Sequence, residues 1–303
     1  MMEKAPIVLL AYNRPEHLKR AVDSLLLNAE AAQTDLYVYC DGAKTLADEP
    51  LVERVRTIAR SIGGFKTVNL TMRDCNMGLA HNVIDSVTQV LDTYGRVIVV
   101  EDDLVVSPYF LQFMNDALDT YKDEERIGHI QACDFTHAPL PDTFLIQWTG
   151  SWGWATWKRA WQHFNPDGRA LLAQLRSRGL THRFDFNGKY GFTRMLRRQT
   201  EGKNDSWAIR WNASLLLEGI LSLNVGRSLV ANEGFDGSGT NCGGGGLYSS
   251  QLWMHPLPVE KIYPIEENLA ARRQYERYYA RTNSFRAKAY RRIVRMLHGD
   301  FGA

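Results

Sequence analysis

The residues with the clearest chemistry in this sequence are three consecutive acids, Glu101, Asp102 and Asp103, which directly follow the apolar run Val97–Val100. Carboxylates this close together repel one another, and it costs free energy to hold them beside a core unless a cation neutralises them. Because the acids offer only oxygen ligands, we expect a hard divalent cation, Mg²⁺ or Mn²⁺, that shares a diphosphate. The alternative is that they cap the next helix, although Ser107 is a better cap.

Polar residues also follow the three earlier apolar runs, at Tyr12–Pro15, Asp41–Gly42 and Arg73–Gly78. In open parallel α/β sheets, ligands bind outside the carboxyl ends of the strands, so these groups are expected to meet at one edge. Asp41 could accept hydrogen bonds from a nucleobase or a ribose, and a plain turn aspartate is the alternative. Asn76 and Gly78 could shape a close backbone approach to the ligand, and ordinary Asn-x-Gly turn chemistry is the alternative.

Other nucleotide sites are not supported. No G-x-G-x-x-G follows the first apolar run and no G-x-x-x-x-G-K-[ST] is present, which argues against a dinucleotide fold and a P-loop. The net charge is +2, but nine Lys and Arg residues face one acid over 272–298. The remaining residues carry 27 bases and 33 acids. We expect no nucleic-acid partner for the main body, because phosphate contacts need a basic face.

The elements that must position these residues alternate between short apolar runs and longer amphipathic ones, which is typical of βαβ units. The pattern predicts strands over 7–12, 36–40, 67–72, 96–100, 127–132 and 143–148. It predicts helices over 15–28, 50–62, 79–93, 108–121, 157–163, 171–178, 192–200, 207–218, 266–281 and 284–298. The expected fold class is α/β, with a mostly parallel sheet and helices on both faces.

The order and spacing of these motifs resemble the GT-A glycosyltransferases, particularly the inverting family 2 and the N-acetylglucosaminyltransferase I-like group. The resemblance rests on Leu10–Pro15, Asp41–Gly42, Asn76–Ala80 and Glu101–Asp103. Three later segments resemble bacterial enzymes of polysaccharide biosynthesis: Gly150–Trp157, Asp205–Trp211 and Asn232–Thr240. The resemblance implies a Rossmann-like half that binds the nucleotide-sugar, over residues 1–125, and an acceptor-binding and catalytic half over 126–258. A basic helical tail would follow over 259–303.

The resemblance also implies roles for single residues. Asp103 would bind the metal, and Asp102 would contact the ribose or the metal shell. Asp41 would recognise a uracil-like base, while Asn13 and Arg14 would line the nucleotide pocket. The tripeptide Glu-Asp-Asp departs from a strict Asp-x-Asp and matches the N-acetylglucosaminyltransferase I-like variant.

An inverting transfer needs a general base near the acceptor hydroxyl. In this fold the base lies downstream of the metal motif, at the start of a helix in the acceptor half, and Asp205 before Trp207 fits that position. The alternative is a helix N-cap, with Trp207 and Trp211 in the core. The other candidate bases are Glu201, Asp185 and Asp236. Trp152 or Trp154, in a glycine-rich turn, could stack on a sugar ring.

We therefore predict a metal-dependent inverting glycosyltransferase that moves a hexosyl or N-acetylhexosaminyl group from a UDP-sugar. The predicted acceptor is a glycan or a lipid-linked saccharide, and the predicted role is in surface polysaccharide biosynthesis. A sugar nucleotidyltransferase is one alternative, but it would need a glycine- and lysine-rich phosphate loop where Asn13–Pro15 stands. A non-catalytic nucleotide- or carbohydrate-binding module is another.

The expected location is cytoplasmic. No apolar run approaches the roughly 20 residues that cross a bilayer, and the first residues lack the pattern of a secretory signal. The segment 284–298 places apolar residues on one helical stripe amid basic ones, so it could hold the protein at the inner face of the cytoplasmic membrane. A terminal helix that packs on the main domain, with a solvated basic face, is the alternative.

Overall fold

A computed structural model describes residues 3–235 and 250–284 of the chain. The strands of its main sheet are β1 (Ile7–Ala11), β2 (Asp35–Cys40), β3 (Thr67–Met72), β4 (Arg96–Glu101), β6 (Ile127–Gln131), β7 (Thr143–Ile146), β8 (Trp154–Trp157) and β9 (Leu221–Val225). A second, two-stranded sheet pairs β5 (Leu104–Val106) with β10 (Val230–Asn232).

The helices are α1 (Pro15–Leu26), α2 (Glu49–Ser61), α3 (Gly78–Tyr94), α4 (Phe110–Thr120), α5 (Lys158–Trp161), α6 (Gly168–Ser177), α7 (Thr181–Phe184), α8 (Phe192–Thr200), α9 (Trp207–Leu217) and α10 (Leu269–Thr282), with a 3₁₀ turn η1 (Ala31–Gln33). The first helix begins with Pro15 in its first turn, where a missing N–H leaves no hydrogen bond unmade. The long helix α3 ends at Gly95, whose φ of 73° is the left-handed conformation that glycine adopts readily.

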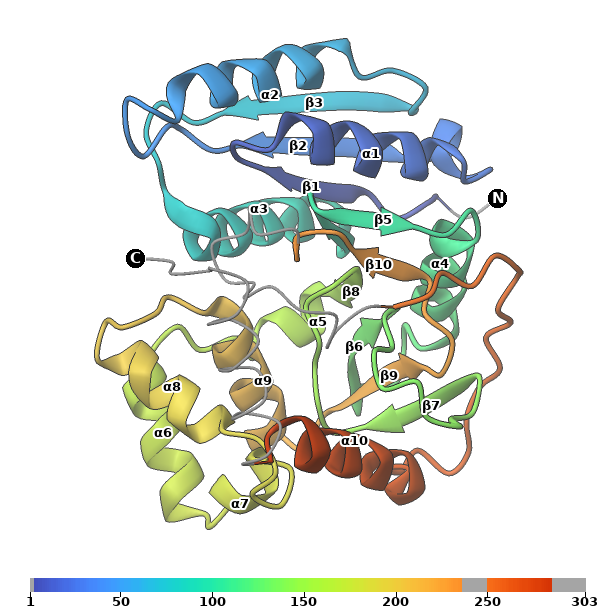
Figure 1. The fold of residues 1–303 in the computed structure, drawn as a ribbon. Helices are drawn as coiled ribbons and strands as arrows, with labels where there is room; N and C mark the ends of the chain where they lie inside the picture. The colour runs from blue at the N-terminus through green and yellow to red at the C-terminus, as the bar shows by residue number, and fades with distance from the viewer. Residues whose placement is uncertain (1–2, 236–249, 285–303) are drawn as a thin grey trace.

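The main sheet has the strand order β3-β2-β1-β4-β8-β6-β9-β7, which runs from top to bottom in Figure 1. The strands are parallel except for β8 and β7, which run antiparallel to their neighbours. The predicted α/β class, a mostly parallel sheet flanked by helices, is therefore confirmed.

Helices cover both faces of the sheet because its central strands β1 and β4 are apolar on both sides. One core includes Leu18 of α1, Val55 of α2 and Phe113 of α4. The core on the other face contains residues of α3, α5 and α9, among them Trp161 and Trp211. A separate aromatic core joins α6, α8 and α10 to the edge strand β7, and these helices form the lower part of the molecule in Figure 1.

The structure corrects the expectation for Trp157. The helix predicted over 157–163 begins only at Lys158, and Trp157 ends strand β8 instead. Trp157 and Trp161 therefore do not share a helix face and lie in different cores. The pairing of β8 with β4 and β6 decides this, and local periodicity carries no information about such distant partners.

Three further strands, β5, β9 and β10, were not predicted from the sequence. The helix predicted over 284–298 falls almost entirely outside the described residues. No helix within residues 3–235 and 250–284 combines the length and the apolar character that crossing a bilayer requires.

Candidate functional site

The three acids lie where the sheet topology reverses. From β1 the chain builds β2 and β3 on one side and then returns to place β4 on the other side of β1. Ligands of open α/β sheets bind at such a point, outside the carboxyl ends of the strands. The backbone N–H of Tyr12 donates to Asp102 Oδ2 at 3.2 Å, and Arg14 Nη1 donates to Asp103 Oδ2 at 2.8 Å. The ends of β1 and β4 therefore meet, as expected from their order.

The second sheet brings a distant segment against Asp103. Strand β5 starts one residue after Asp103, and its partner β10 places Asn232 opposite Leu104. Glu233 N–H then donates to the Asp103 carbonyl at 2.9 Å. A Cβ atom on Gly234 would lie 2.3 Å from Asp103 Oδ2, so an alanine there would force this carboxylate to move. Gly234 is a site neighbour that the sequence interpretation did not select, although it stands in a segment that carries the family resemblance.

The two carboxylate oxygens of Asp103 have different surroundings. Its Oδ1 is buried and has no hydrogen-bond partner in the described part of the chain. Its Oδ2 forms the ion pair with Arg14, and both side chains are largely buried, with 11% and 16% exposed. Buried polar atoms are almost always partnered. A bare oxygen on a buried carboxylate is therefore a candidate cation ligand.

Negative charge in this turn exceeds the positive charge around it. Burial raises the pKa of Asp102 to about 7, with a further increase from Asp103 and an opposing effect of Arg14. Burial also raises the pKa of Glu101 well above its usual range, and the charges of Asp103 and Asp102 add to this effect. Such crowding of acids suits a divalent cation.

A complete metal shell is not built by side chains alone. Within residues 3–235 and 250–284, no three His, Cys, Asp or Glu side chains are grouped to hold an ion. This pattern still fits Mg²⁺ or Mn²⁺ with a nucleotide, because Mg²⁺ usually keeps several waters and takes one or two carboxylates together with substrate phosphates. Asp103 and Asp102 are the side chains in position to supply them.

Asp41 lies at the end of β2, where its carboxylate holds the turn before α3. Its Oδ1 accepts from the N–H groups of Gly42 and Met77, at 2.9 and 2.8 Å. Its Oδ2 accepts from Gly78 N–H and Asn76 Nδ2, at 3.0 and 3.1 Å. These four bonds use the acceptor capacity of a carboxylate. They match the turn chemistry that was the alternative for Asp41, Asn76 and Gly78, and contact of these residues with a nucleotide stays a prediction.

Asn13 ties the end of β1 to the loop before α2. Its Nδ2 donates to Asp48 Oδ1 at 3.0 Å, and the neighbouring Tyr12 hydroxyl accepts from Lys44 N–H at 3.0 Å. Burial raises the pKa of Tyr12 above its usual value. Tyr12 and Asp48 thus belong to the same edge as Asp102. Tyr12 stands in the motif Leu10–Pro15, but nothing in the local sequence marks Asp48 as a partner of Asn13.

Asp205 lies two residues before the first residue of α9 and does not cap this helix. The cap is Ser206, whose hydroxyl accepts from Ile209 N–H at 3.2 Å. The N-cap part of the alternative for Asp205 is therefore wrong, whereas Trp207 and Trp211 do lie in the core, as that alternative expected. The Asp205 side chain is 56% exposed and accepts from Arg210 Nη2 at 2.9 Å, while the Arg210 side chain is only 8% exposed. The carboxylate is both reachable and held in place by a buried cation.

Stacked tryptophans join the start of α9 to the strands β8 and β4. Trp207 stacks on Trp154, with ring centroids 5.1 Å apart. Trp154 pairs with Val99 of β4, two residues before Glu101. Trp154 is fully buried, so it cannot stack on a sugar. Trp152 is only partly buried, and its ring lies 5.6 Å from that of Phe235 beside Gly234.

The other candidate bases are less suitably placed or are not described. Glu201 is exposed and pairs with Lys203. Asp185 accepts from Thr193 N–H at 2.6 Å at the start of α8, and burial raises its pKa. Asp236 lies outside the described residues.

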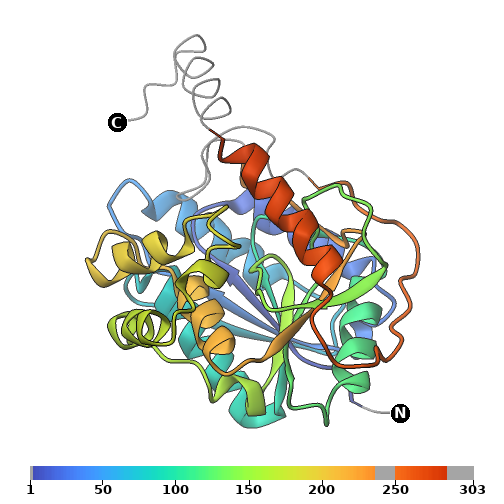
Figure 2. The ribbon, with the colours of Figure 1, turned by 90° about the horizontal axis from the view of Figure 1, so that it is seen from below.

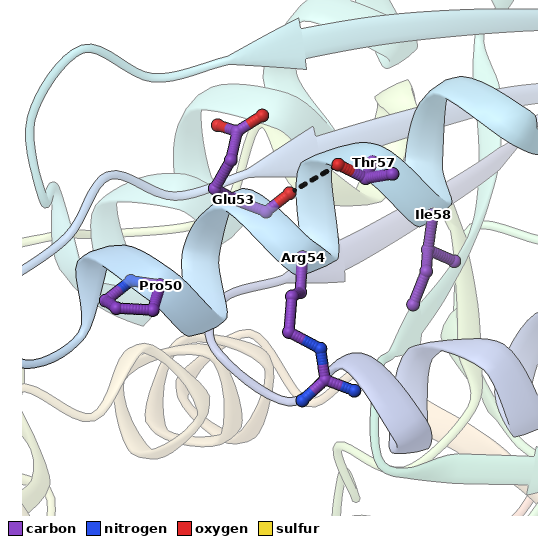
Figure 3. A pocket seen from close by; sticks show the side chains of 5 residues that line it. All are labelled: Pro50, Glu53, Arg54, Thr57 and Ile58. Atoms are coloured by element: carbon purple, nitrogen blue, oxygen red, sulfur yellow. Dashed lines mark hydrogen bonds between the residues drawn. The ribbon is translucent and has the colours of Figure 1, made fainter.

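A surface hollow of about 520 Å³ on α2 (Figure 3) takes no part in this arrangement. Its lining consists of Pro50, Glu53, Arg54, Thr57 and Ile58. None of the predicted site residues lines it.

No protein-family model matches this sequence, and no curated protein matches it either. Among solved structures, the mannosyltransferase PcManGT from Pyrobaculum calidifontis, in complex with GDP-Man and Mn²⁺, is similar at 12% identity and a TM-score of 0.42, over 72% of this chain and 70% of PcManGT. TarS of S. aureus is similar at 15% identity and a TM-score of 0.37, over 54% of this chain. The match spans only 30% of TarS. Both similarities are distant and concern the fold.

Proposed function

We propose that this protein is a metal-dependent inverting glycosyltransferase. Its donor would be a UDP-sugar, and its acceptor would be a glycan or a lipid-linked saccharide. The observation that carries the proposal is the acidic turn at the topological switch point, with Asp103 Oδ1 buried and without a hydrogen-bond partner among the described residues. Uncompensated buried carboxylates are unfavourable. A divalent cation bound to a diphosphate would remove that penalty and place a leaving group at this edge.

Asp103 and Asp102 would hold the cation. When bound, Mn²⁺ or Mg²⁺ would stabilise the negative charge that develops on the departing diphosphate. Arg14 lies within hydrogen-bond distance of Asp103 and would supply further positive charge to the phosphates. Glu101 would lie beside the site, where burial raises the pKa of its carboxyl well above the usual range.

The nucleoside would lie over the ends of β1 and β2, against Asn13 and the turn held by Asp41. Asp41 would act chiefly through the shape of the turn that Asn76 and Gly78 form. Direct recognition of a base by Asp41 would require one of its four hydrogen bonds to be replaced. A UDP donor, a hexosyl or N-acetylhexosaminyl group and a role in surface polysaccharide biosynthesis are parts of the proposal that follow from the family resemblance.

Asp205 would act as the general base. Its carboxylate would take the proton of the acceptor hydroxyl as that oxygen bonds to the sugar anomeric carbon. The bond from this carbon to the diphosphate breaks on the opposite face, which inverts the configuration. Arg210 would orient the carboxylate through the 2.9 Å contact.

Calorimetric titration with UDP tests the donor site. Binding that requires Mn²⁺, disappears with EDTA and is lost in Asp103→Ala supports the proposal. GDP, CDP and dTDP complete the series, and GDP is of special interest because PcManGT was solved with GDP-Man. Binding of a nucleotide or saccharide that needs no metal and is unchanged in Asp103→Ala would instead favour a binding module.

Asp205→Asn tests the base separately from the donor site. Transfer should fall by about 10²–10⁴-fold, which is the usual contribution of a general base. The affinity for UDP and Mn²⁺ should remain unchanged, since Asp205 is assigned to the acceptor. A variant that keeps the wild-type transfer rate would exclude Asp205 as the base.

A further inference from the structure

The exposed face of helix α10 is basic. Arg273, Arg277 and Arg281 are all exposed and follow one another at intervals of four residues, so they lie on one face of the helix. Figure 2 shows α10 on the outside of the fold, on the side seen from below. Like charges four residues apart destabilise a helix. Helix stability therefore does not explain this row of arginines.

A fourth basic residue, Lys189, lies beside this face of α10 on a neighbouring loop. The loop between α7 and α8 packs against α10, where Asn187 Nδ2 donates to Glu276 Oε1 at 2.7 Å. Lys189 of this loop lines a hollow of about 210 Å³ between the loop and the helix. The other residues of the hollow are Arg273, Glu276, Arg277 and Ala280.

Among the described residues, the positive charge of this face is not neutralised by ion pairs. Glu276 already accepts from Asn187 and pairs with the buried Arg272 at 3.3 Å. Lys189, Arg273 and Arg281 form no ion pair with any residue in 3–235 or 250–284. Arg277 donates a long hydrogen bond to Gln274, at 3.5 Å. The groove is therefore complementary to an anionic group.

We propose that this basic face, formed by Lys189, Arg273, Arg277 and Arg281, docks the protein on the phosphate groups of an anionic lipid surface. Leu269 precedes Arg273 by four residues on the same face and is 56% exposed, and a bilayer interface would shield such an apolar side chain from water. Recognition of an acidic glycan is less favoured, because Tyr275, Tyr278 and Tyr279 of α10 are buried and offer no ring for sugar stacking.

This inference is independent of the proposed transferase activity. It also differs from the expectation for segment 284–298, since it concerns α10 and the loop before α8. Each basic residue near an anionic surface improves partitioning by about fivefold, or about 1 kcal/mol. Removing two of the four should therefore weaken vesicle binding by about 25-fold.

The test is co-sedimentation of the full chain with vesicles of phosphatidylcholine, alone and with about 30% phosphatidylglycerol. The variant is Arg273→Gln with Arg277→Gln. Its matched control is Arg54→Gln with Arg60→Gln, which removes the same charge from α2 at the opposite end of the molecule in Figure 1. Thermal unfolding of both variants checks that the fold is intact.

Binding that requires phosphatidylglycerol, falls about 25-fold in the α10 variant and is retained in the α2 control supports the proposal. Equal losses in both variants would show a general effect of net charge and overturn it. No loss in the α10 variant would also overturn it, since any binding would then come from other residues. A third arm adds heparin or glycerol phosphate to the protein without vesicles. Tight binding there that depends on Arg273 and Arg277, without vesicle binding, would assign the groove to a soluble anion instead.

Discussion

Replacing Asp102 with asparagine should stabilise the metal-free protein at high pH. Burial and the charge of Asp103 raise the pKa of Asp102 to about 7 in the folded state, whereas an unfolded aspartate ionises near about 3.9. Between these values the folded protein keeps a proton that the unfolded chain has released. The stability contributed by Asp102 therefore falls as the pH rises from about 4 to about 7, and the full penalty is present above that window.

The size of the effect follows from the two pKa values. A difference of about three pKa units corresponds to about 4 kcal/mol, which is an upper limit for the gain in Asp102→Asn. Asparagine stays neutral at every pH, and its Oδ1 can still accept the 3.2 Å hydrogen bond from Tyr12 N–H. Below about pH 4 the wild-type carboxyl is itself protonated, so the two proteins should be nearly equal in stability.

Urea denaturation in EDTA at about pH 4, 6 and 8 measures this difference. The control is Asp142→Asn, since Asp142 is exposed and pairs with Arg227, and its effect should stay within about 0.5 kcal/mol at each pH. Added Mn²⁺ should stabilise the wild type more than Asp102→Asn, because only the wild type keeps both carboxylates. A gain that does not change with pH, or a loss of stability at about pH 8, would refute this account of the acidic turn.

Three further substitutions test the neighbouring structure. Asp41→Asn should lower the free energy of unfolding, measured by urea denaturation, by about 2–4 kcal/mol. The reason is that an amide oxygen cannot accept all the hydrogen bonds that the N–H groups now donate to the carboxylate. An unchanged free energy of unfolding would show that the turn does not depend on the Asp41 carboxylate. Gly234→Ala should weaken Mn²⁺-dependent UDP binding at least about tenfold in calorimetry, since its Cβ would lie 2.3 Å from Asp103 Oδ2. The control is Gly63→Ala, whose Cβ would have no atom within 4 Å, and this variant should bind UDP as the wild type does. Trp154→Ala should lower the free energy of unfolding by about 3–5 kcal/mol, because this side chain is fully buried between His129 and Trp207. A decrease of less than about 1 kcal/mol would contradict that packing.

Much of the fold was predictable because its signals are local. The strand Thr67–Met72 and the helix Phe192–Thr200 were predicted with the observed bounds. Most of the other predicted helices and strands differ from the observed ones by only a few residues at their ends. The meeting of Arg14 with the acidic turn was also expected, because the rule for parallel sheets brings the carboxyl ends of neighbouring strands to one edge.

The individual contacts of the site were not predictable in the same way. The pattern around Asp41 allowed either a nucleotide contact or a turn, and only the positions of Met77 and Gly78 show that the turn occupies its carboxylate. The same holds for Asp205, since a helix start leaves open which of two adjacent residues provides the cap. The structure assigns the cap to Ser206 and leaves Asp205 with Arg210.

The amino-acid sequence by itself determined the alternation of strands and helices, the α/β class and the chemical types of residue that follow each strand. These features depend on hydrophobic periodicity and on turn residues, which lie close together in the chain. Only the tertiary structure decided that β8 enters the sheet between β4 and β6, and that β10 pairs with β5 and brings Gly234 against Asp103. Hydrogen bonds between residues more than twenty positions apart in the sequence cause both arrangements. Such bonds leave no trace in local periodicity, because any exposed strand edge can in principle accept them.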